Sequence, residues 1–424
     1  MVPQPSSDTP RLRILWVRVG GCLPLNSGGV IYSYHLLMYL MQHCHVHALE
    51  LRRLGEEGPT TTVPYAHELE CVMIQRLAEY SPRHFFQFIG PILRNLFASR
   101  EPFVQALYLS SEFNKRVRER VLSGQFDLVI VDGLLAAPSV EGWAQERRVP
   151  VILLQHNVEA TVWSRMARLQ RNPFMWLFYH EMARRMRRRE PEMCRAFDAV
   201  LTNSGPDADY HRDTYRLPQV LGSVIPGTNP CQSAPPPAVL QQEAAPCIAF
   251  VGAMNWPPNV DGAIWFIQEV LPLLRKTLPT VRFRIIGREP PPAFYRLAAS
   301  TPGIEITGTV PVVLPLLREC AVQVVPLRAG SGVRHKILES MAAGVPVVST
   351  TLGAEGLFLR DEHEIILADD APALSAALVR LLQDSALRQT IAENAFTRIN
   401  QEFLWDHSGA KLLRLCSTLL PPNG

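Results

Sequence analysis

Short apolar runs rich in β-branched residues alternate along the chain with longer stretches of helical character. In the first half these runs are Leu12–Val19, His45–Leu51, Leu128–Asp132, Val151–Gln155 and Ala199–Asn203. In the second half they are Cys247–Gly252, Arg282–Gly287, Glu305–Gly308, Ala321–Pro326, Val345–Thr350 and Glu364–Leu367. Such alternation is typical of parallel sheets covered by helices. We therefore predict an α/β protein with one doubly wound, Rossmann-like parallel sheet in each half.

A proline-rich stretch, Leu217–Pro246, separates the two sets of runs. Proline lacks the backbone N–H and clashes within a helix, so neither a helix nor a central strand is expected there. We predict a Rossmann-like domain over residues 1–215, a linker over 216–246 and a second Rossmann-like domain over 247–385. The helical stretch over 386–424 is expected to cross back onto the first domain. A length of 424 residues fits two domains, since single domains typically hold about 100 to 200 residues.

One segment, Pro326–Thr350, has the order strand, glycine-rich turn, helix and strand. Gly330 and Gly332 would let the backbone approach a ligand closely, because glycine has no side chain. The helix starting near Val333 would point its unpaired N–H groups and its positive dipole end at the same place, which suits a diphosphate. In doubly wound sheets ligands bind beyond the carboxyl ends of the strands, so two facing sheets would form a ligand cleft between the domains.

Three charged residues follow the glycines. Lys336 and Glu339 are three positions apart and would share one face of the helix, while Arg334 would lie in its first turn. A cation would then meet phosphate while the carboxylate meets a ribose diol. The segment lacks the Gly-Lys-Ser/Thr of a nucleoside triphosphate loop and the GxGxxG of a dinucleotide fingerprint. The alternative is a glycine-rich turn that only links strand and helix.

Charge and cysteine content narrow the function further. The 42 basic and 39 acidic residues show no clustered basic face, so nucleic-acid binding is not expected. The eight cysteines are scattered without a CxxC pair, which predicts neither a zinc site nor a disulfide framework and favours a reducing compartment.

Apolar stretches long enough for a targeting or membrane segment are not found. The first apolar run, Ile14–Val19, is shorter than that of a signal peptide, and no run reaches the ~20 residues of a membrane helix, so we expect a cytoplasmic protein. The run Arg184–Arg189 continues a helix with apolar residues at helical spacing, namely Met175, Phe178, Met182 and Met186. We interpret these as a core-facing stripe; the alternative is peripheral contact with anionic lipids at the inner face of the membrane.

The segment Pro326–Glu339, PLRAGSGVRHKILE, resembles the PLRxGSGxRxKxLE segment of bacterial sugar transferases. These transferases belong to the large retaining family 4 of glycosyltransferases, also called glycosyl transferases group 1, whose members have the two-domain GT-B fold. Further likenesses follow in the order that the family shows, at Phe250–Asp261, Ile285–Arg288, Ile306–Gly308 and Gly353–Leu357. In the first half they are Pro24–Gly29, Gln155–Glu159 and Val224–Asn229.

The resemblance implies a retaining transfer of a hexose-type sugar from a UDP- or GDP-sugar to a glycan or lipid-linked acceptor. It also implies that no metal and no cofactor is needed, because positive side chains and the helix dipole stabilise the departing diphosphate. Two alternatives stay open. A nucleotide-sugar epimerase of the same fold would convert its substrate without an acceptor, and a non-catalytic nucleotide-sugar-binding protein would show no turnover.

By the same resemblance, Glu339 would contact the ribose, Arg334 and Lys336 would lie near the diphosphate, and His156 would face the donor sugar. These four are the expected catalytic residues, with His156 orienting the sugar or polarising a hydroxyl rather than attacking it. Further donor contacts are implied at Gly28, Gly29, Gly252, Asn255, Thr307, Gly308, Gly330, Ser331 and Gly332.

Two features depart from the family pattern. Ser331 stands where many members have a glutamate, eight positions before Glu339, so backbone amides are expected to hold the sugar. The loop after Gly252 lacks the basic residue of many relatives, which leaves Arg288 as a further candidate cation. Asp132 also follows a strand, but it has an ordinary interpretation as a helix cap or surface carboxylate and is left out of the predicted site.

Overall fold

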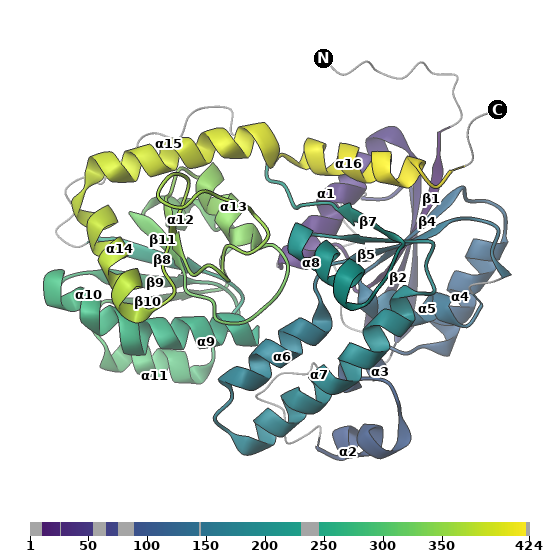
Figure 1. The fold of residues 1–424 in the computed structure, drawn as a ribbon, viewed down its shortest axis with the longest axis horizontal. Coiled ribbons are helices and arrows are strands. Elements are labelled where there is room, and N and C mark those ends of the chain that lie inside the picture. The colour runs from purple at the N-terminus through teal and green to yellow at the C-terminus, as the bar shows by residue number, and fades with distance from the viewer. Residues whose placement is uncertain are drawn as a thin grey trace. The chain divides into compact units, whose positions relative to one another are not determined.

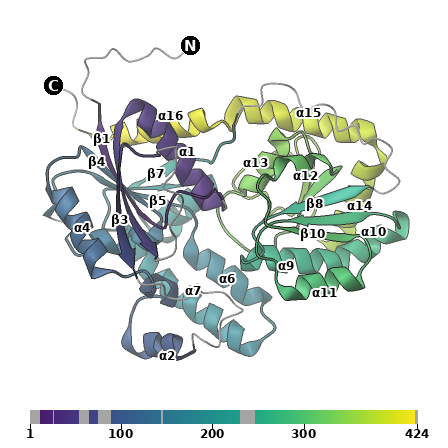
Figure 2. The same cartoon turned by 180° about the vertical axis from the view of Figure 1, so that it is seen from behind.

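The computed structural model of the protein describes residues 11–25, 27–53, 65–74, 89–143, 146–229 and 246–420. The chain splits into two compact units. The first unit runs to Val158, takes up Arg184–Val224 and resumes at Ser408, and the second unit holds Glu159–Ala183 and Ile225–His407. Each unit is built around one parallel sheet, which confirms the predicted pair of doubly wound α/β domains (Figure 1, Figure 2). The expected cleft between the domains stays a prediction.

The first unit contains a seven-stranded sheet whose neighbouring strands are all parallel. The strand order is β3 (Glu68–Ile74), β2 (His45–Arg53), β1 (Arg13–Val19), β4 (Leu128–Asp132), β5 (Val151–Gln155), β6 (Ala199–Thr202) and β7 (Val220–Ser223). The order reverses between β1 and β4, which is where ligands bind in doubly wound sheets. There the register sets Arg18 beside Asp132.

Helices cover the faces of this first sheet. They include α1 (Gly28–His43), α4 (Ser111–Leu122) and α8 (Gly205–Asp209), which contact strands of the sheet. The unit also contains α2 (Ile89–Ala98), α3 (Phe103–Ala106) and α5 (Pro138–Glu141), with the single turns η2 (Leu134–Ala136) and η4 (Tyr210–Thr214). Every residue of β4 and β5 is buried, because both faces of the central strands are covered. This double burial explains why these strands form continuous apolar runs in the sequence.

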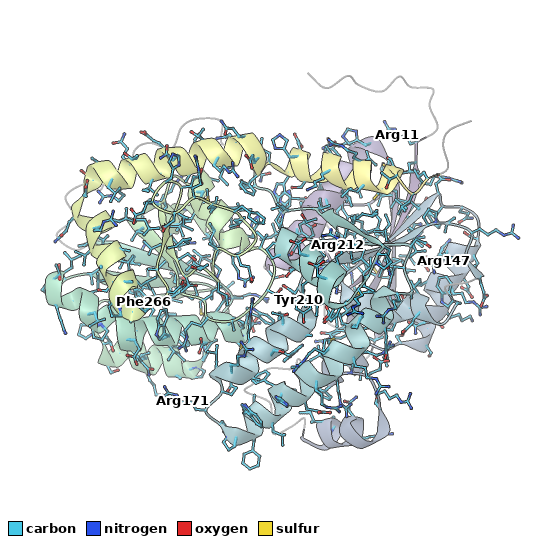
Figure 3. The ribbon with its side chains drawn as sticks, viewed as in Figure 1. Arg11, Arg147, Arg171, Tyr210, Arg212 and Phe266 are labelled. Atoms are coloured by element: carbon cyan, nitrogen blue, oxygen red, sulfur yellow. The ribbon has the colours of Figure 1, made fainter. Side chains whose placement is uncertain are left out.

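The second unit contains a six-stranded parallel sheet. Its order is β10 (Ile304–Gly308), β9 (Arg282–Ile286), β8 (Cys247–Val251), β11 (Val322–Val325), β12 (Val347–Ser349) and β13 (Ile366–Leu367), with the reversal between β8 and β11. Next to the sheet, the rings of Phe266, labelled in Figure 3, and Phe283 pack with centroids 4.4 Å apart. Both rings are buried in the hydrophobic core of this unit.

Helices α9 (Pro257–Trp265), α10 (Leu271–Thr277) and α11 (Pro292–Ser300) gather on one side of the second sheet, and α12 (Leu314–Arg318) and α13 (His335–Ala342) on the other (Figure 1, Figure 2). The turn η5 (Phe266–Val270) joins α9 to α10, and α14 (Ala371–Gln383) and α15 (Ser385–Glu402) follow the last strand. Helix α6 (Glu159–Leu169) belongs to the second unit by its contacts. Helices α7 (Pro173–Cys194) and α16 (Trp405–Ser417) begin in the second unit and end in the first.

Several boundaries differ from the sequence-based prediction. The apolar pattern does not predict β3, because its residues alternate between exposed and half-buried positions at the edge of the sheet. Strand β7 lies inside the predicted linker 216–246; it is an edge strand, so the neighbouring prolines do not interrupt a central ladder. Residues 159–183 and 386–407 group with the second unit, so the limits predicted at 215 and 386 do not coincide with the units.

The apolar stripe of α7 has the predicted orientation. Phe178, Met182 and Met186 are buried and Met175 is half-buried, which confirms the core-facing interpretation for three of the four residues. On the basic side, Arg189 pairs with Glu101 and Glu141. Among the residues that the structure describes, no helix combines the length and the apolar character needed to cross a membrane. Peripheral membrane contact stays a prediction.

Candidate functional site

The glycine-rich turn after β11 has a backbone that requires glycine. Gly330 has a φ of +121° and Gly332 a φ of +76°, conformations that residues with a side chain rarely adopt. A Cβ atom on Gly330 would also lie 2.6 Å from the guanidinium of Arg334. The turn leads into α13, and the first N–H groups of an α-helix have no intrahelical acceptor. Backbone groups at this place are therefore suited to binding an anion.

The ammonium of Lys336 lies beside Gly252, directly after β8. Its Nζ donates to Asn259 Oδ1 at 2.8 Å and lies 4.5 Å from the centre of the Phe250 ring. Asn259 Nδ2 donates in turn to the carbonyl oxygen of Ala253 at 2.9 Å. Gly252 leaves room for this contact, since a Cβ atom there would lie 2.8 Å from both Lys336 Nζ and Asn259 Nδ2. The structure thus brings together two predicted residues, Gly252 and Lys336, around an asparagine that was not predicted to contact the donor.

The charge of Lys336 is sensitive to its surroundings. Burial lowers the pKa of Lys336 to about 7. The positive charge of Arg334 lowers this pKa further, whereas the negative charge of Glu339 opposes the shift. Near neutral pH the side chain is therefore about half protonated. An anion arriving beside it would stabilise the charged form, so this lysine would take up a proton on binding.

Glu339 lies on the same helix and is held by a histidine. Its Oε1 is 3.3 Å from His335 Nδ1, and 36% of its side-chain surface is exposed. Burial alone would raise the pKa of Glu339, but His335 and Lys336 lower it on balance. Glu339 is therefore a carboxylate at neutral pH with oxygen surface left to accept hydrogen bonds from a ligand.

Arg334 differs from its predicted place. Helix α13 begins at His335 rather than near Val333, so Arg334 is the N-cap residue and not part of the first turn. Its guanidinium folds back onto the carbonyl oxygens of Ser331 and Gly332. Arg334 thus lies beside the turn, as predicted, and it stabilises the backbone of the turn by hydrogen bonds.

A second arginine near the turn was missed. Arg165 on α6 donates to the carbonyl oxygen of Gly330 and pairs with both carboxylate oxygens of Glu355, at 2.7 and 2.9 Å. Glu355 belongs to the segment Gly353–Leu357. No signal in the sequence marks Arg165, because it is one of many helical arginines and lies far from the turn along the chain.

Other predicted donor residues lie elsewhere in the second unit. Asn255 and Arg288 both bind the carboxylate of Glu289, at 3.0 and 3.2 Å, and a role of Arg288 at the diphosphate stays a prediction. Thr307 and Gly308 end β10, the edge strand that is separated from β8 by β9.

The first unit brings His156 and the start of α1 together. Helix α1 begins at Gly28, and a Cβ atom on Gly29 would lie 3.2 Å from His156 Nδ1. On the other ring nitrogen, His156 Nε2 lies 2.6 Å from Asp132 Oδ1. The Tyr32 ring and the imidazole pack in a T-shaped arrangement, with centroids 5.4 Å apart. His156 is therefore enclosed, and its orientation is set by Asp132.

Asp132 is buried, which corrects its interpretation as a helix cap or surface carboxylate. It accepts hydrogen bonds from Arg18 and, at 3.2 Å, from Trp16 Nε1. Burial alone would raise the pKa of Asp132, but Arg18 and His156 hold it well below its usual range. An ionised carboxylate only accepts hydrogen bonds, so Nε2 of His156 carries the proton and Nδ1 lies next to Gly29. A signal for Asp132 was available, since an acidic residue ends a fully apolar central strand.

Each of these two groups of residues lies in a part of the chain that matches a known protein family. Residues 27–227 match the family described as Glycosyltransferase Family 4, and residues 245–384 match the family described as Glycosyl transferases group 1. Both halves of the chain are glycosyltransferase domains. The family 4 domain contains Asp132 and His156, and the group 1 domain contains Gly252, the glycine-rich turn and α13.

Relatives of this glycosyltransferase include an uncharacterised 44.6 kDa protein in the cps region of Klebsiella pneumoniae, which is 21% identical over 349 residues, covering 80% of this chain and 86% of the relative. The phosphatidyl-myo-inositol mannosyltransferase of Mycolicibacterium smegmatis is 28% identical over 177 residues, covering 41% of this chain and 45% of the relative. Among solved structures, Anabaena Alr3699/HepE in complex with UDP-glucose has a TM-score of 0.64 and 14% identity, with 96% of this chain and 100% of that chain covered. The structural similarity concerns the fold, GT-B.

Proposed function

We propose that this glycosyltransferase transfers a hexose-type sugar, with retention of configuration, from a UDP- or GDP-sugar to a glycan or lipid-linked acceptor. The position of Lys336 carries the proposal, because a half-buried ammonium lies beside Gly252 on the helix that follows the glycine-rich turn. A diphosphate bound there would meet the cation and the N-terminal N–H groups of α13 together. On the same helix, Glu339 would accept hydrogen bonds from the ribose.

The similar proteins support a nucleotide-sugar donor. Alr3699/HepE forms a complex with UDP-glucose, and the relative from Mycolicibacterium smegmatis is named for mannosyl transfer. Both names contain a hexose, which supports a hexose-type sugar for this chain as well.

We assign His156 to the sugar rather than to the nucleotide. Asp132 holds the Nε2 side of the ring, and the Nδ1 side lies beside Gly29 at the start of α1. A front-face retaining transfer needs no covalent nucleophile from the enzyme, so His156 would orient the donor sugar or polarise a hydroxyl. Gly28 and Gly29 would present backbone to the donor beside it.

The proposed chemistry uses no metal, because Lys336, Arg334 and the α13 dipole would balance the charge of the departing diphosphate. An Asp-x-Asp spacing occurs at Asp207 and Asp209 of α8. Asp207 is buried, and Asp209 pairs with Arg212 at 2.8 Å. Over the described part of the chain, no three His, Cys, Asp or Glu side chains are grouped to hold a metal ion.

Thermal unfolding in the presence of UDP, GDP, ADP and NAD tests the donor class. A ligand present at a hundred times its Kd adds about 2.7 kcal/mol to the free energy of unfolding. We expect UDP or GDP to stabilise the protein and NAD to have no effect. Stabilisation by NAD alone would show that the glycine-rich turn has been misinterpreted.

Product analysis with the stabilising donor then separates the three candidate functions. A transferase releases the nucleoside diphosphate only when an acceptor is supplied, and its product keeps the anomeric configuration of the donor. Activity should be the same with and without EDTA, whereas a strict Mn²⁺ or Mg²⁺ requirement would contradict the metal-free mechanism. Conversion of the donor without acceptor would identify an epimerase, and binding without any turnover would identify a binding protein.

A further inference from the structure

The first residue of α13, His335, has contacts on three sides. Its Nε2 lies 3.0 Å from the carbonyl oxygen of Gly227, and its Nδ1 lies 3.3 Å from Glu339 Oε1. Its ring stacks on Trp405, with centroids 5.6 Å apart and planes inclined by 23°. Only 10% of the side-chain surface is exposed. An imidazole enclosed in this way keeps one orientation, and so does a carboxylate that is paired with it.

Both nitrogens of His335 face acceptors. A carbonyl oxygen only accepts hydrogen bonds, so Nε2 carries hydrogen, and the ion pair of the Nδ1 side with the Glu339 carboxylate requires a protonated ring. Burial alone would lower the pKa of His335, but Glu339 and the carbonyl of Gly227 raise it on balance. The imidazolium and the Glu339 carboxylate thus stabilise each other's charged forms.

The partners of His335 are themselves tightly packed. A Cβ atom on Gly227 would lie 2.5 Å from the backbone of Leu404 and Trp405. The backbone N–H of Trp405 donates to the carbonyl oxygen of Thr228 at 3.2 Å. Two segments from distant parts of the chain therefore pack closely together next to His335.

We propose that His335 is a positioning residue that orients the Glu339 carboxylate for the ribose hydroxyls of the donor nucleotide. The inference rests on the proposed function, in which Glu339 binds the ribose. Successive helical residues point about 100° apart, and Lys336 contacts Asn259 instead of Glu339. His335 therefore acts on the ribose, whereas Lys336 acts on the diphosphate.

The test compares the dissociation constants of UDP and 2′,3′-dideoxy-UDP by titration calorimetry, with GDP and its dideoxy analogue in parallel. Their ratio isolates the ribose hydroxyls, because the base, the diphosphate and Lys336 contribute equally to both ligands. The wild-type protein should prefer the hydroxylated nucleotide at least about tenfold, as expected for hydrogen bonds to a charged group. His335→Phe keeps an aromatic ring on Trp405 but has no N–H, and its ratio should fall below about threefold. His363→Gln, at an exposed histidine of the same unit, is the control and should keep the wild-type ratio.

The pH dependence of the wild-type ratio gives a readout that needs no variant. The pKa of His335 is raised, so its contribution is complete at low pH and is lost as the pH rises through that value. The ratio should therefore fall with increasing pH. Deprotonation of the neighbouring Lys336 weakens both ligands alike and cancels in the ratio, and Arg334 keeps its charge throughout. His335→Gln should give a lower ratio that does not change with pH.

The outcomes separate the inference from the proposed function. If the wild-type protein binds neither UDP nor GDP, the proposed function fails and the inference fails with it. If the nucleotide binds but the ratio is unchanged in His335→Phe and constant with pH, only the inference is wrong. If circular dichroism shows that His335→Phe is unfolded, the wild-type pH series and His335→Gln decide the question.

Discussion

Lys336 is only partly charged at neutral pH, because burial lowers its pKa to about 7. A bound diphosphate would stabilise the ammonium, so donor binding would require proton uptake above neutral pH. We expect the Kd of a nucleotide sugar to be constant below about pH 7 and to rise up to about tenfold per pH unit above it. Titration calorimetry with the intact nucleotide sugar is the measurement, since its phosphates keep the same charge across this range.

Lys336→Met should bind the same donor at least about tenfold more weakly, because a charged hydrogen-bond donor is lost. Its Kd should rise less steeply with pH than that of the wild-type protein, since only the contribution of His335 is left to titrate. Lys276→Met is the matched control, since Lys276 is an exposed lysine on α10 of the same unit. If the Kd rose equally with pH in the wild-type protein and in Lys336→Met, the assignment of Lys336 to the diphosphate would be wrong.

Asp132 and Arg18 form a buried ion pair, and such a pair is costly to break. Asp132→Asn leaves the Arg18 guanidinium buried without its counter-charge, so the free energy of unfolding should fall by about 3 to 5 kcal/mol. Asp209→Asn breaks an exposed pair with Arg212 and should change the free energy of unfolding by less than about 1 kcal/mol. Urea unfolding followed by circular dichroism measures both. If the two substitutions lowered the free energy of unfolding equally, the buried Asp132–Arg18 pair would contribute no more to stability than the exposed pair.

Among elements, the close approach of β8 and α13 depends on Gly252. Gly252→Ala places a Cβ atom 2.8 Å from both Lys336 Nζ and Asn259 Nδ2, and their flexible side chains would have to separate. Donor affinity should then fall about tenfold, the value of one charged hydrogen bond, while thermal stability changes little. Calorimetry and thermal unfolding provide the two measurements.

Gly142→Ala is the control for Gly252→Ala. Gly142 ends α5 with a φ of −74°, and a Cβ atom there meets nothing within 4 Å. The donor affinity of Gly142→Ala should therefore equal that of the wild-type protein. Unchanged affinity in Gly252→Ala as well would mean that the Lys336–Asn259 contact is not needed for donor binding.

For the whole molecule, a buried histidine predicts sensitivity to acid. Burial lowers the pKa of His211 to about 4, and its Nδ1 lies 2.8 Å from the carbonyl oxygen of Asp207. Glu190 Oε1 lies 3.8 Å from the other ring nitrogen. Because the folded pKa is below the unfolded value of about 6.5, the unfolded state takes up the proton first as the pH falls. The stability present above about pH 6.5 should therefore decrease by about 3 kcal/mol towards pH 4.

Urea unfolding of the wild-type protein and of His211→Gln over this pH range checks the prediction. His211→Gln should remove most of the pH dependence, because glutamine does not titrate. His363→Gln, at an exposed histidine, should follow the wild-type curve. If His211→Gln and the wild-type protein lose stability in parallel, other groups cause the acid sensitivity.

The sequence by itself determined the features that depend on local pattern. Alternating apolar runs and helical stretches were enough for two parallel sheets, because the central strands are buried on both faces and leave continuous apolar runs. The strand, turn and helix of Pro326–Thr350 could be predicted because Gly330 and Gly332 and the spacing of Lys336 and Glu339 are properties of neighbouring residues. The edge strands β3 and β7 were missed, since half-exposed strands carry no such pattern.

Only the tertiary structure decided which distant side chains meet. Asp132 contacts His156 because β4 and β5 are adjacent in the sheet, and it contacts Arg18 because the register of β1 sets the two side by side. His335 contacts both Gly227 and Trp405 because two remote segments pack together behind α13. Periodicity reports which face of an element is buried, but the partner across that face depends on strand order, register and packing over long separations.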